Sequence, residues 1–225
     1  MVPRILIDTA EIPGGGGELR LIRRGEEYSI MLGANELMNS RLSGSEEALA
    51  TLVCRRLVGA ATPTILIGGL GMGFTLRDAL DALGPEAKLV VAELVPGVVK
   101  WARGPLAHIF GGSIEDPRVR IVEADVADLI AEARSAYDAI LLDVDNGPDA
   151  LTRAANDRLY DKGGLALARA ALRPGGVLAI WSAAPDRSFS QRLRNAGFAV
   201  EETMVRANAG RSGARHVIWL AANPR

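Results

Sequence analysis

The sequence predicts an α/β protein with a Rossmann-like, doubly wound and mostly parallel sheet, and a small antiparallel β-extension at the N-terminus. Two observations lead to this fold class. From residue 64 onward, continuously apolar runs alternate with helical stretches of about ten residues, which is typical of βαβ units in a sheet buried on both faces. Residues 1–44 instead contain short strand-like runs separated by turn signals. We therefore expect a β-extension over 1–44 and a Rossmann-like domain over 45–225.

Composition excludes several classes of function. The 225 residues are enough for one α/β domain plus a small extension. The 26 basic and 27 acidic side chains give a net charge of −1, so no overall charge attracts nucleic acid or an anionic membrane. Only two histidines are present, which disfavours a histidine-rich metal site. The single cysteine, Cys54, and the lack of a long apolar leader or span predict a cytoplasmic protein with one buried thiol.

The extension is predicted to contain three strands, over residues 4–8, 18–23 and 27–32. A run of glycines at 14–17 precedes a strand and not a helix, so it favours a hairpin connection over a phosphate loop. A helix is expected over 45–59. Ser45 is suited to cap this helix, and Glu46 and Glu47 stand in its first turn, where the helix dipole favours acids.

The core elements then follow in regular alternation. Apolar runs of strand length are expected to form buried parallel strands over 64–67, 88–93, 118–122, 139–142 and 177–182. Helices are expected over 74–83, 96–103, 126–134, 164–172 and 188–195. Pro96 stands near the first position of its helix and Gly197 follows the end of the last helix, which are the places these residues favour. Two closing strands are expected over 198–205 and 216–221.

A glycine-rich loop with Gly69, Gly71 and Gly73 follows the first core strand. Glycines permit a tight turn and bring a ligand against bare backbone, and the next helix presents its free N–H groups. Glu93 and Asp125 follow the next two strands. About twenty residues past the loop, an acid such as Glu93 can accept both ribose hydroxyls, and Asp125 suits an adenine amino group. Together they predict a binding site for an adenosyl-type donor.

Two other interpretations compete with this one. The loop spacing is G-x-G-x-G, and it lacks the third glycine of G-x-G-x-x-G that packs helix and strand around a pyrophosphate. A dinucleotide cofactor is therefore less favoured than an adenosyl-type donor. Loop glycines also occur in plain strand-to-helix turns, although an acid after each of the next two strands argues against that reading.

The order of elements resembles the class I S-adenosylmethionine-dependent methyltransferase fold, and within it the spermidine synthase (aminopropyltransferase) branch. The similar segments are residues 37–40, 46–47, 65–69, 93–99, 116–119, 125, 137–143, 159–160 and 172–176. The resemblance implies that the donor is S-adenosylmethionine or its decarboxylated form. It also implies a small amine as acceptor and a homodimer joined through the N-terminal extension.

The acceptor side departs from the family pattern, which leaves the acceptor open. Asn146 occupies the position of the family's catalytic aspartate, and acids stand instead at Asp145 and Asp149. An amine acceptor must lose a proton before it attacks the donor, and acids in this loop are suited to bind the ammonium and take up that proton. We predict that Asp145 is the base or the amine anchor. Asp143, at the strand end, is predicted to orient the donor and to take part in catalysis.

Three more residues are predicted to bind the acceptor. These are Asp149 in the same loop, Tyr160, and Glu46, which stands with Ser45 where the family has a Tyr-His pair. The alternative for the loop acids is that they cap the following turn, because aspartate and asparagine favour turns. A magnesium ion held by Asp143 and its loop neighbours is a further alternative that we do not expect.

These observations support one leading hypothesis and two alternatives. The leading hypothesis is a transferase that moves an aminopropyl group from an S-adenosyl-type donor to a small, polyamine-type amine. The first alternative is methyl transfer from S-adenosylmethionine to a small molecule, which the missing catalytic-position acid favours. The second is a binding domain that kept the fold and lost the reaction. None of the three involves a nucleic-acid or membrane partner.

Overall fold

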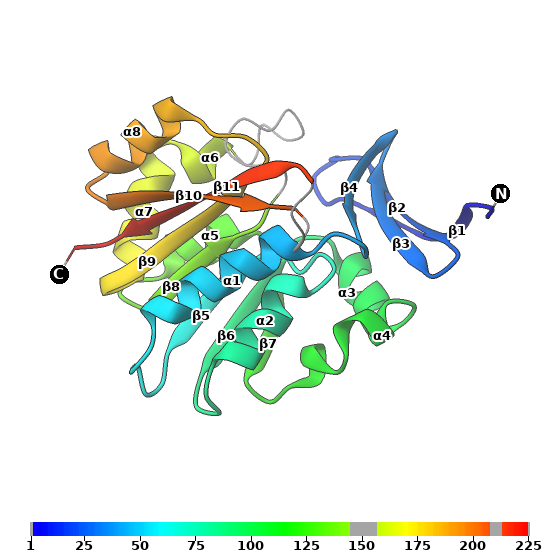
Figure 1. Cartoon of the computed structure of the whole chain (residues 1–225), viewed down its shortest axis with the longest axis horizontal. Helices are drawn as coiled ribbons and strands as arrows, with labels where there is room; N and C mark the ends of the chain where they lie inside the picture. Colours follow the sequence, from blue (N-terminus) through cyan, green and yellow to red (C-terminus); the bar gives the residue numbers. More distant parts are fainter. Residues whose placement is uncertain (1, 145–156, 208–212, 225) are drawn as a thin grey trace.

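The computed structural model describes residues 2–144, 157–207 and 213–224, and this part of the chain is organised around two sheets (Figure 1). The smaller sheet is four-stranded and antiparallel, with strand order β1-β2-β3-β4. The larger sheet is seven-stranded, has the order β10-β11-β9-β8-β5-β6-β7, and is parallel from β9 to β7. The predicted fold class is confirmed.

The small sheet is the predicted N-terminal extension. Its strands are β1 (Ile5–Glu11), β2 (Glu18–Arg24), β3 (Glu27–Leu32) and β4 (Asn35–Asn39). The glycine run connects β1 to β2, and Gly14, Gly15 and Gly17 have positive φ angles, as a tight connection requires. Strand β4 adds to the predicted elements. Its sequence Asn-Glu-Leu-Met-Asn holds no β-branched residue, so pairing with β3 decides its conformation.

The large domain follows the predicted alternation of helices and strands. Its main elements are α1 (Gly44–Arg56), β5 (Thr64–Gly68), α2 (Phe74–Ala82), β6 (Lys88–Glu93), α3 (Pro96–Arg103), β7 (Val119–Glu123), α5 (Val126–Glu132), β8 (Tyr137–Leu142), α7 (Lys162–Ala171), β9 (Leu172–Ser182), α8 (Arg187–Asn195), β10 (Ala199–Arg206) and β11 (Arg215–Ala222). Three short elements were not predicted: α4 (Ala107–Phe110), the 3₁₀ turn η1 (Ser113–Glu115) and α6 (Asp157–Tyr160). The predicted closing pair is present, because β11 lies antiparallel between β9 and β10.

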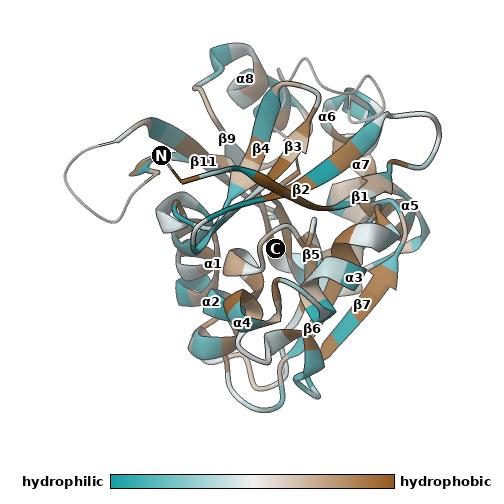
Figure 2. Ribbon diagram, turned by 90° about the vertical axis from the view of Figure 1, so that its right-hand side faces the viewer, coloured by the Kyte–Doolittle hydropathy of each residue, from teal (hydrophilic) through white to brown (hydrophobic). Residues whose placement is uncertain are grey.

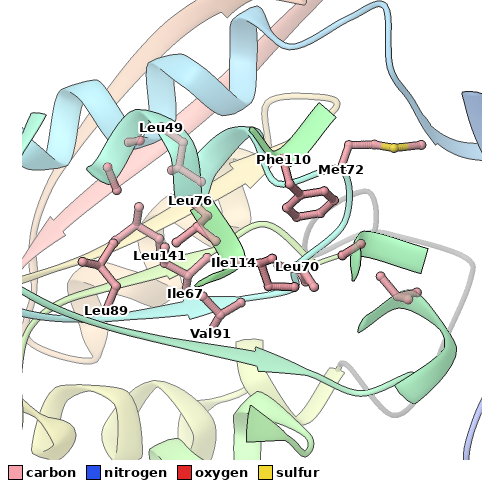
Figure 3. Packing of buried hydrophobic residues seen from close by; sticks show 14 of the residues in the cluster. Leu49, Ile67, Leu70, Met72, Leu76, Leu89, Val91, Phe110, Ile114 and Leu141 are labelled. Carbon is pink, nitrogen blue, oxygen red and sulfur yellow. The ribbon is translucent and has the colours of Figure 1, made fainter. Parts of the chain in front are cut away.

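Side chains of the central strands alternate between two hydrophobic layers. Ile65 and Ile67 of β5 belong to the layer that α1, α2 and α3 cover, whereas Leu66 belongs to the layer under α5, α7 and α8. Figure 3 shows the first layer, in which Leu49 of α1 and Leu76 of α2 lie over Ile67. Because helices bury both faces of the sheet, its strands are continuously apolar in sequence.

The extension and the large domain share the first of these layers. Leu21 of β2 is fully buried and belongs to the same cluster as the residues under α1, α2 and α3. Strand β1 packs on α3 so closely that a Cβ at Gly97 would lie 2.2 Å from the Cβ of Ala10. The indole N–H of Trp101 donates to Oδ2 of Asp8 at 3.0 Å. Figure 2 shows the small sheet beside α3, so one edge of the extension is fixed against the domain that carries the site.

Helix α1 corrects one prediction and confirms another. It begins at Gly44, and no side chain caps its N-terminus. The prediction that Ser45 caps the helix is wrong, because its hydroxyl bonds Glu46 and His216 instead. Cys54 is buried as predicted, and burial raises the pKa of its thiol to about 11.

In the described part of the chain, no helix has the length and hydropathy needed to cross a bilayer.

Candidate functional site

The glycine-rich loop leaves β5 where the large sheet reverses its strand order. Strand β5 pairs with β6 on one side and with β8 on the other, and ligands bind in the crevice outside such a switch point. Gly69, Gly71 and Gly73 have φ angles of 88°, 50° and 79°, a region that other residues rarely adopt. A Cβ at Gly69 would also lie 2.9 Å from the carbonyl oxygen of Asp143. The backbone therefore requires the predicted glycines, and they lie at the predicted crevice.

Glu93 ends β6 and ties the glycine loop to the next turn. Its Oε2 accepts the N–H of Leu70 at 2.9 Å, and its Oε1 accepts the N–H of Val95 at 2.8 Å. Burial raises the pKa of this carboxyl, and the backbone N–H groups oppose that change. The carboxylate therefore fixes the glycine loop and the turn after β6 at the crevice.

Asp125 caps α5 and also forms an ion pair. Its Oδ1 accepts the N–H of Ala127 at 2.9 Å, which is the helix-capping role common for aspartate. Its Oδ2 lies 2.7 Å from Nη2 of Arg158 in α6. Arg158 is half exposed, so the pair contributes little to stability, and its effect is to fix the direction of the Asp125 carboxylate.

A cavity opens between these strand ends and the small sheet, and we call it the Glu93 cavity. It contains about 860 Å³ of empty space, part of which is open to solvent. Gly69, Gly71, Asp125 and Asp143 line it together with Glu93. The extension supplies an apolar wall: Ile12, Leu19, Ile30, Leu32, Leu37 and Met38.

A second cavity lies on the other side of the glycine loop, and we call it the Glu46 cavity. It contains about 650 Å³ of empty space, again partly open to solvent. Glu46 of α1, Trp181 of β9 and Asn39 at the end of β4 line it, together with Gly73. Asp143 borders both cavities.

Asp143 and Glu46 influence each other across the second cavity. Burial and then the negative charge of Glu46 raise the pKa of Asp143 to about 7, and a hydrogen bond from the Thr75 hydroxyl at 2.9 Å opposes the change. Burial likewise raises the pKa of Glu46, against a hydrogen bond from the Ser45 hydroxyl at 2.7 Å. At neutral pH this pair of carboxyl groups can both attract a cation and accept a proton.

Acids are the only charged side chains that line the two cavities in the described part of the chain. They are Glu46, Glu93, Asp125 and Asp143. No lysine or arginine of that part lines either cavity. The described chain also contains no cluster of three or more potential metal ligands. The arrangement suits a positively charged organic ligand.

The remaining predicted site residues lie elsewhere. Asp145 and Asp149, with Asn146, fall within 145–156 and so lie outside the described residues. Tyr160 does not line either cavity. It is 2% exposed and packs edge-on against Phe189, with ring centroids 5.7 Å apart. The structure therefore corrects the prediction that Tyr160 binds the acceptor, because α6 directs this ring into the core on the other face of the sheet.

Several residues of the site were missed from sequence: Thr75, Arg158, Trp181 and His216. Thr75 had a local signal, since the first turn of the helix after a glycine loop faces the ends of neighbouring strands. The other three had none. They reach the site from elements that are distant in sequence.

Fold and site together define a Rossmann-like α/β protein with an acid-lined crevice at the switch point of its sheet, and comparisons specify its relatives. No family model matches the chain. It is 31% identical over 163 residues to polyamine aminopropyltransferase 1 of Streptomyces coelicolor, covering 69% of this chain and 30% of that protein. It is 29% identical over 192 residues to the polyamine aminopropyltransferase of Mycobacterium tuberculosis, covering 81% and 35%. The chain thus spans about a third of the length of these curated relatives.

Solved structures show the same fold at lower sequence identity. Spermidine synthase in complex with the transition state analogue AdoDATO has a TM-score of 0.72 at 18% identity, covering 97% of this chain and 72% of that one. A Burkholderia thailandensis 1,6-didemethyltoxoflavin-N1-methyltransferase has a TM-score of 0.57 at 20% identity, covering 81% and 80%. The resemblance to the spermidine synthase-like branch of the class I methyltransferase fold is confirmed.

Proposed function

We propose that this protein transfers an aminopropyl group from decarboxylated S-adenosylmethionine to a small amine. The observation that carries the proposal is the all-acid lining of the Glu93 and Glu46 cavities. The decarboxylated donor bears a sulfonium and an ammonium and no carboxylate. Intact S-adenosylmethionine would bring a carboxylate among four acids, of which Asp125 is paired with Arg158, and no lysine or arginine of the described chain lines either cavity. The aminopropyltransferase relatives agree with this choice of donor.

In this proposal the Glu93 cavity holds the donor. Glu93 accepts the ribose hydroxyls with its carboxylate oxygens, which also accept the N–H groups of Leu70 and Val95. Asp125, held by Arg158, accepts the adenine amino group, and the apolar wall from the extension covers the adenosine. Asp143 lies at the border of the two cavities and faces the cationic part of the donor.

The Glu46 cavity then holds the acceptor amine. Its ammonium is attracted by Glu46 and Asp143, which also provide a place for its proton. The freed nitrogen lone pair attacks the propyl carbon next to sulfur, a new C–N bond forms, and the C–S bond breaks to leave a neutral thioether. The chemistry needs mainly in-line positioning of two bound reactants. Asp145 and Asp149 remain proposed contributors to the same acceptor site.

Calorimetry and turnover test the proposal together. We expect decarboxylated S-adenosylmethionine to bind at least tenfold more tightly than the intact form, and the enzyme to turn over with putrescine as acceptor. Glu46→Gln should raise the KM for putrescine and lower kcat, while the exposed control Glu132→Gln at the end of α5 should match the wild type. Tighter binding of intact donor would refute aminopropyl transfer and favour a methyltransferase. Binding without turnover over a broad amine panel would favour a binding domain.

The cellular location and the oligomeric state of the protein are also proposals. We propose that it works in the cytoplasm as a homodimer, without a nucleic-acid partner. Size-exclusion chromatography with light scattering measures the oligomeric state, and a monomer at micromolar concentration would refute the dimer.

A further inference from the structure

Glu46 is the end of a hydrogen-bonded chain that leads out of its cavity. The Ser45 hydroxyl lies 2.7 Å from Oε2 of Glu46 and 3.0 Å from Nδ1 of His216. Ser45 is 1% exposed, so water does not compete for its hydroxyl. These hydrogen bonds join the first turn of α1 to the start of β11. Ser45 and His216 are 171 positions apart in the sequence.

The position of His216 is fixed by the aromatic side chain beside it. Its ring packs edge-on against Trp181, with centroids 4.7 Å apart and planes at 74°. Trp181 lines the Glu46 cavity, whereas His216 lines neither cavity and is only partly buried. The imidazole therefore stands behind the cavity wall. It is connected to the cavity through Ser45 and Glu46.

We propose that Ser45 and His216 are positioning residues that direct the Glu46 carboxylate at the acceptor and carry the acceptor's proton away from the cavity. The inference rests on the proposed aminopropyl transfer, because that reaction releases one proton from the amine in each turnover.

The proton moves in balanced steps. Glu46 accepts the proton from the attacking amine, and its carboxylic acid then donates to the Ser45 oxygen. The Ser45 hydroxyl gives its own proton to Nδ1 of His216, which restores the Glu46 carboxylate and creates an imidazolium. The imidazolium releases the proton on Nε2 to solvent, which leaves the Nδ1–H tautomer. Tautomer exchange through solvent then restores the Nε2–H form, whose free Nδ1 accepts the next proton. A hydroxyl can serve both directions because it has one donor and two acceptor positions.

Steady-state kinetics with decarboxylated S-adenosylmethionine and putrescine test the path. Ser45→Ala and His216→Gln should each lower kcat about tenfold or more and leave donor affinity, measured by calorimetry, within about twofold of the wild type. Ser45→Thr, which keeps the hydroxyl, should restore kcat to within about threefold. The control is His108→Gln, because His108 contacts the ring of Tyr28 and lines neither cavity. Unchanged kcat in Ser45→Ala would overturn the proposal.

A double-mutant cycle separates the path from a purely structural tie between α1 and β11. If Ser45 acts through Glu46, adding Ser45→Ala to Glu46→Gln should lower kcat no further. Losses that multiply in the double variant would overturn the proposal. A structural tie would instead lower the melting temperature without this non-additivity in kcat.

A spectroscopic readout keeps the inference testable if the proposed function itself fails. Absence of aminopropyl turnover by the wild type would refute the function. The ¹⁵N resonance of Nδ1 in His216 would still report the hydrogen-bonded chain. We expect Glu46→Gln and Ser45→Ala to shift this resonance relative to the wild type, and His108→Gln to leave it in place. An Nδ1 resonance that both variants leave unchanged would overturn the coupling of Glu46 to His216.

Discussion

Replacing Asp143 with asparagine is expected to stabilise the fold above neutral pH and to change it much less in acid. Burial first, and then the charge of Glu46, raise the pKa of Asp143 from 3.8 to about 7. Between these values the folded protein keeps a proton that the unfolded chain releases, so the free energy of unfolding falls as pH rises. This loss of unfolding free energy is absent at pH values below the pKa of Asp143 in the unfolded chain. It reaches its full size at pH values above the pKa of Asp143 in the folded protein. Asparagine has no such titration, and its amide oxygen can still accept the Thr75 hydroxyl.

The magnitude follows from the two pKa values. One pKa unit corresponds to about 1.36 kcal/mol. With 3.8 in the unfolded chain and about 7 in the folded protein, the penalty is on the order of 2 kcal/mol at pH 5 and 4 kcal/mol at pH 8. The gain in unfolding free energy from Asp143→Asn should therefore be larger at pH 8 than at pH 5 by on the order of 2–3 kcal/mol.

Urea unfolding of the wild type and the variant at pH 5 and pH 8 measures this difference. Asp116→Asn is a control of opposite sign, because the hydrogen bond and charge of Arg118 lower the pKa of Asp116. That control should lose stability at pH 8 and lose less as the pH falls toward the pKa of Asp116. A gain from Asp143→Asn that is equal at both pH values, or a loss at pH 8, would refute the reasoning.

Three further predictions concern single residues. Gly73→Ala should destabilise by about 1–3 kcal/mol in thermal unfolding, because φ is 79° and the new Cβ would lie 2.4 Å from the ring of Phe110; an unchanged melting temperature would contradict this. Ser190→Ala should cost about 1–3 kcal/mol in urea unfolding, since the buried indole N–H of Trp219 loses its 2.8 Å partner, and Ser190→Thr should cost less. Glu93→Gln should weaken donor binding at least tenfold in calorimetry, because an amide nitrogen cannot accept the hydrogen bonds that a carboxylate oxygen accepts; wild-type affinity would exclude a ribose contact.

The core of the fold was predictable because burial on both sides of a parallel sheet leaves a strong pattern. Strand β6 (Lys88–Glu93) and helix α3 (Pro96–Arg103) match their predicted bounds, since polar residues delimit the strand and a proline starts the helix. Strand β4 and the short helices α4 and α6 were not predictable. Segments of four or five residues are too short to show the spacing of apolar residues that identifies a helix or a strand. Their conformation depends on neighbours that only the folded chain supplies.

The residues around the Glu93 cavity were easier to predict from the sequence than those around the Glu46 cavity. Glu93 and Asp125 were predicted as neighbours because both end parallel strands, and such ends meet at one edge of the sheet. Trp181 and His216 carry no local signal of a site in the sequence. They meet Ser45 because β11 inserts antiparallel between β9 and β10, a pairing that no local signal encodes. Tyr160 was misplaced for a related reason, since its ring direction follows from a helix of four residues.

The buried acids of the two cavities lower the stability of the folded protein, and this loss argues for a cationic ligand. Burial raises the pKa values of Glu46, Glu93 and Asp143, so each carboxylate opposes folding at neutral pH. A fold that needed only packing would be more stable with neutral side chains at these positions. A ligand that carries two positive charges would favour the ionised carboxylates and return the electrostatic cost as binding free energy. In the proposed function, the residues that destabilise the free protein are therefore also the ones that select the decarboxylated donor over the intact one.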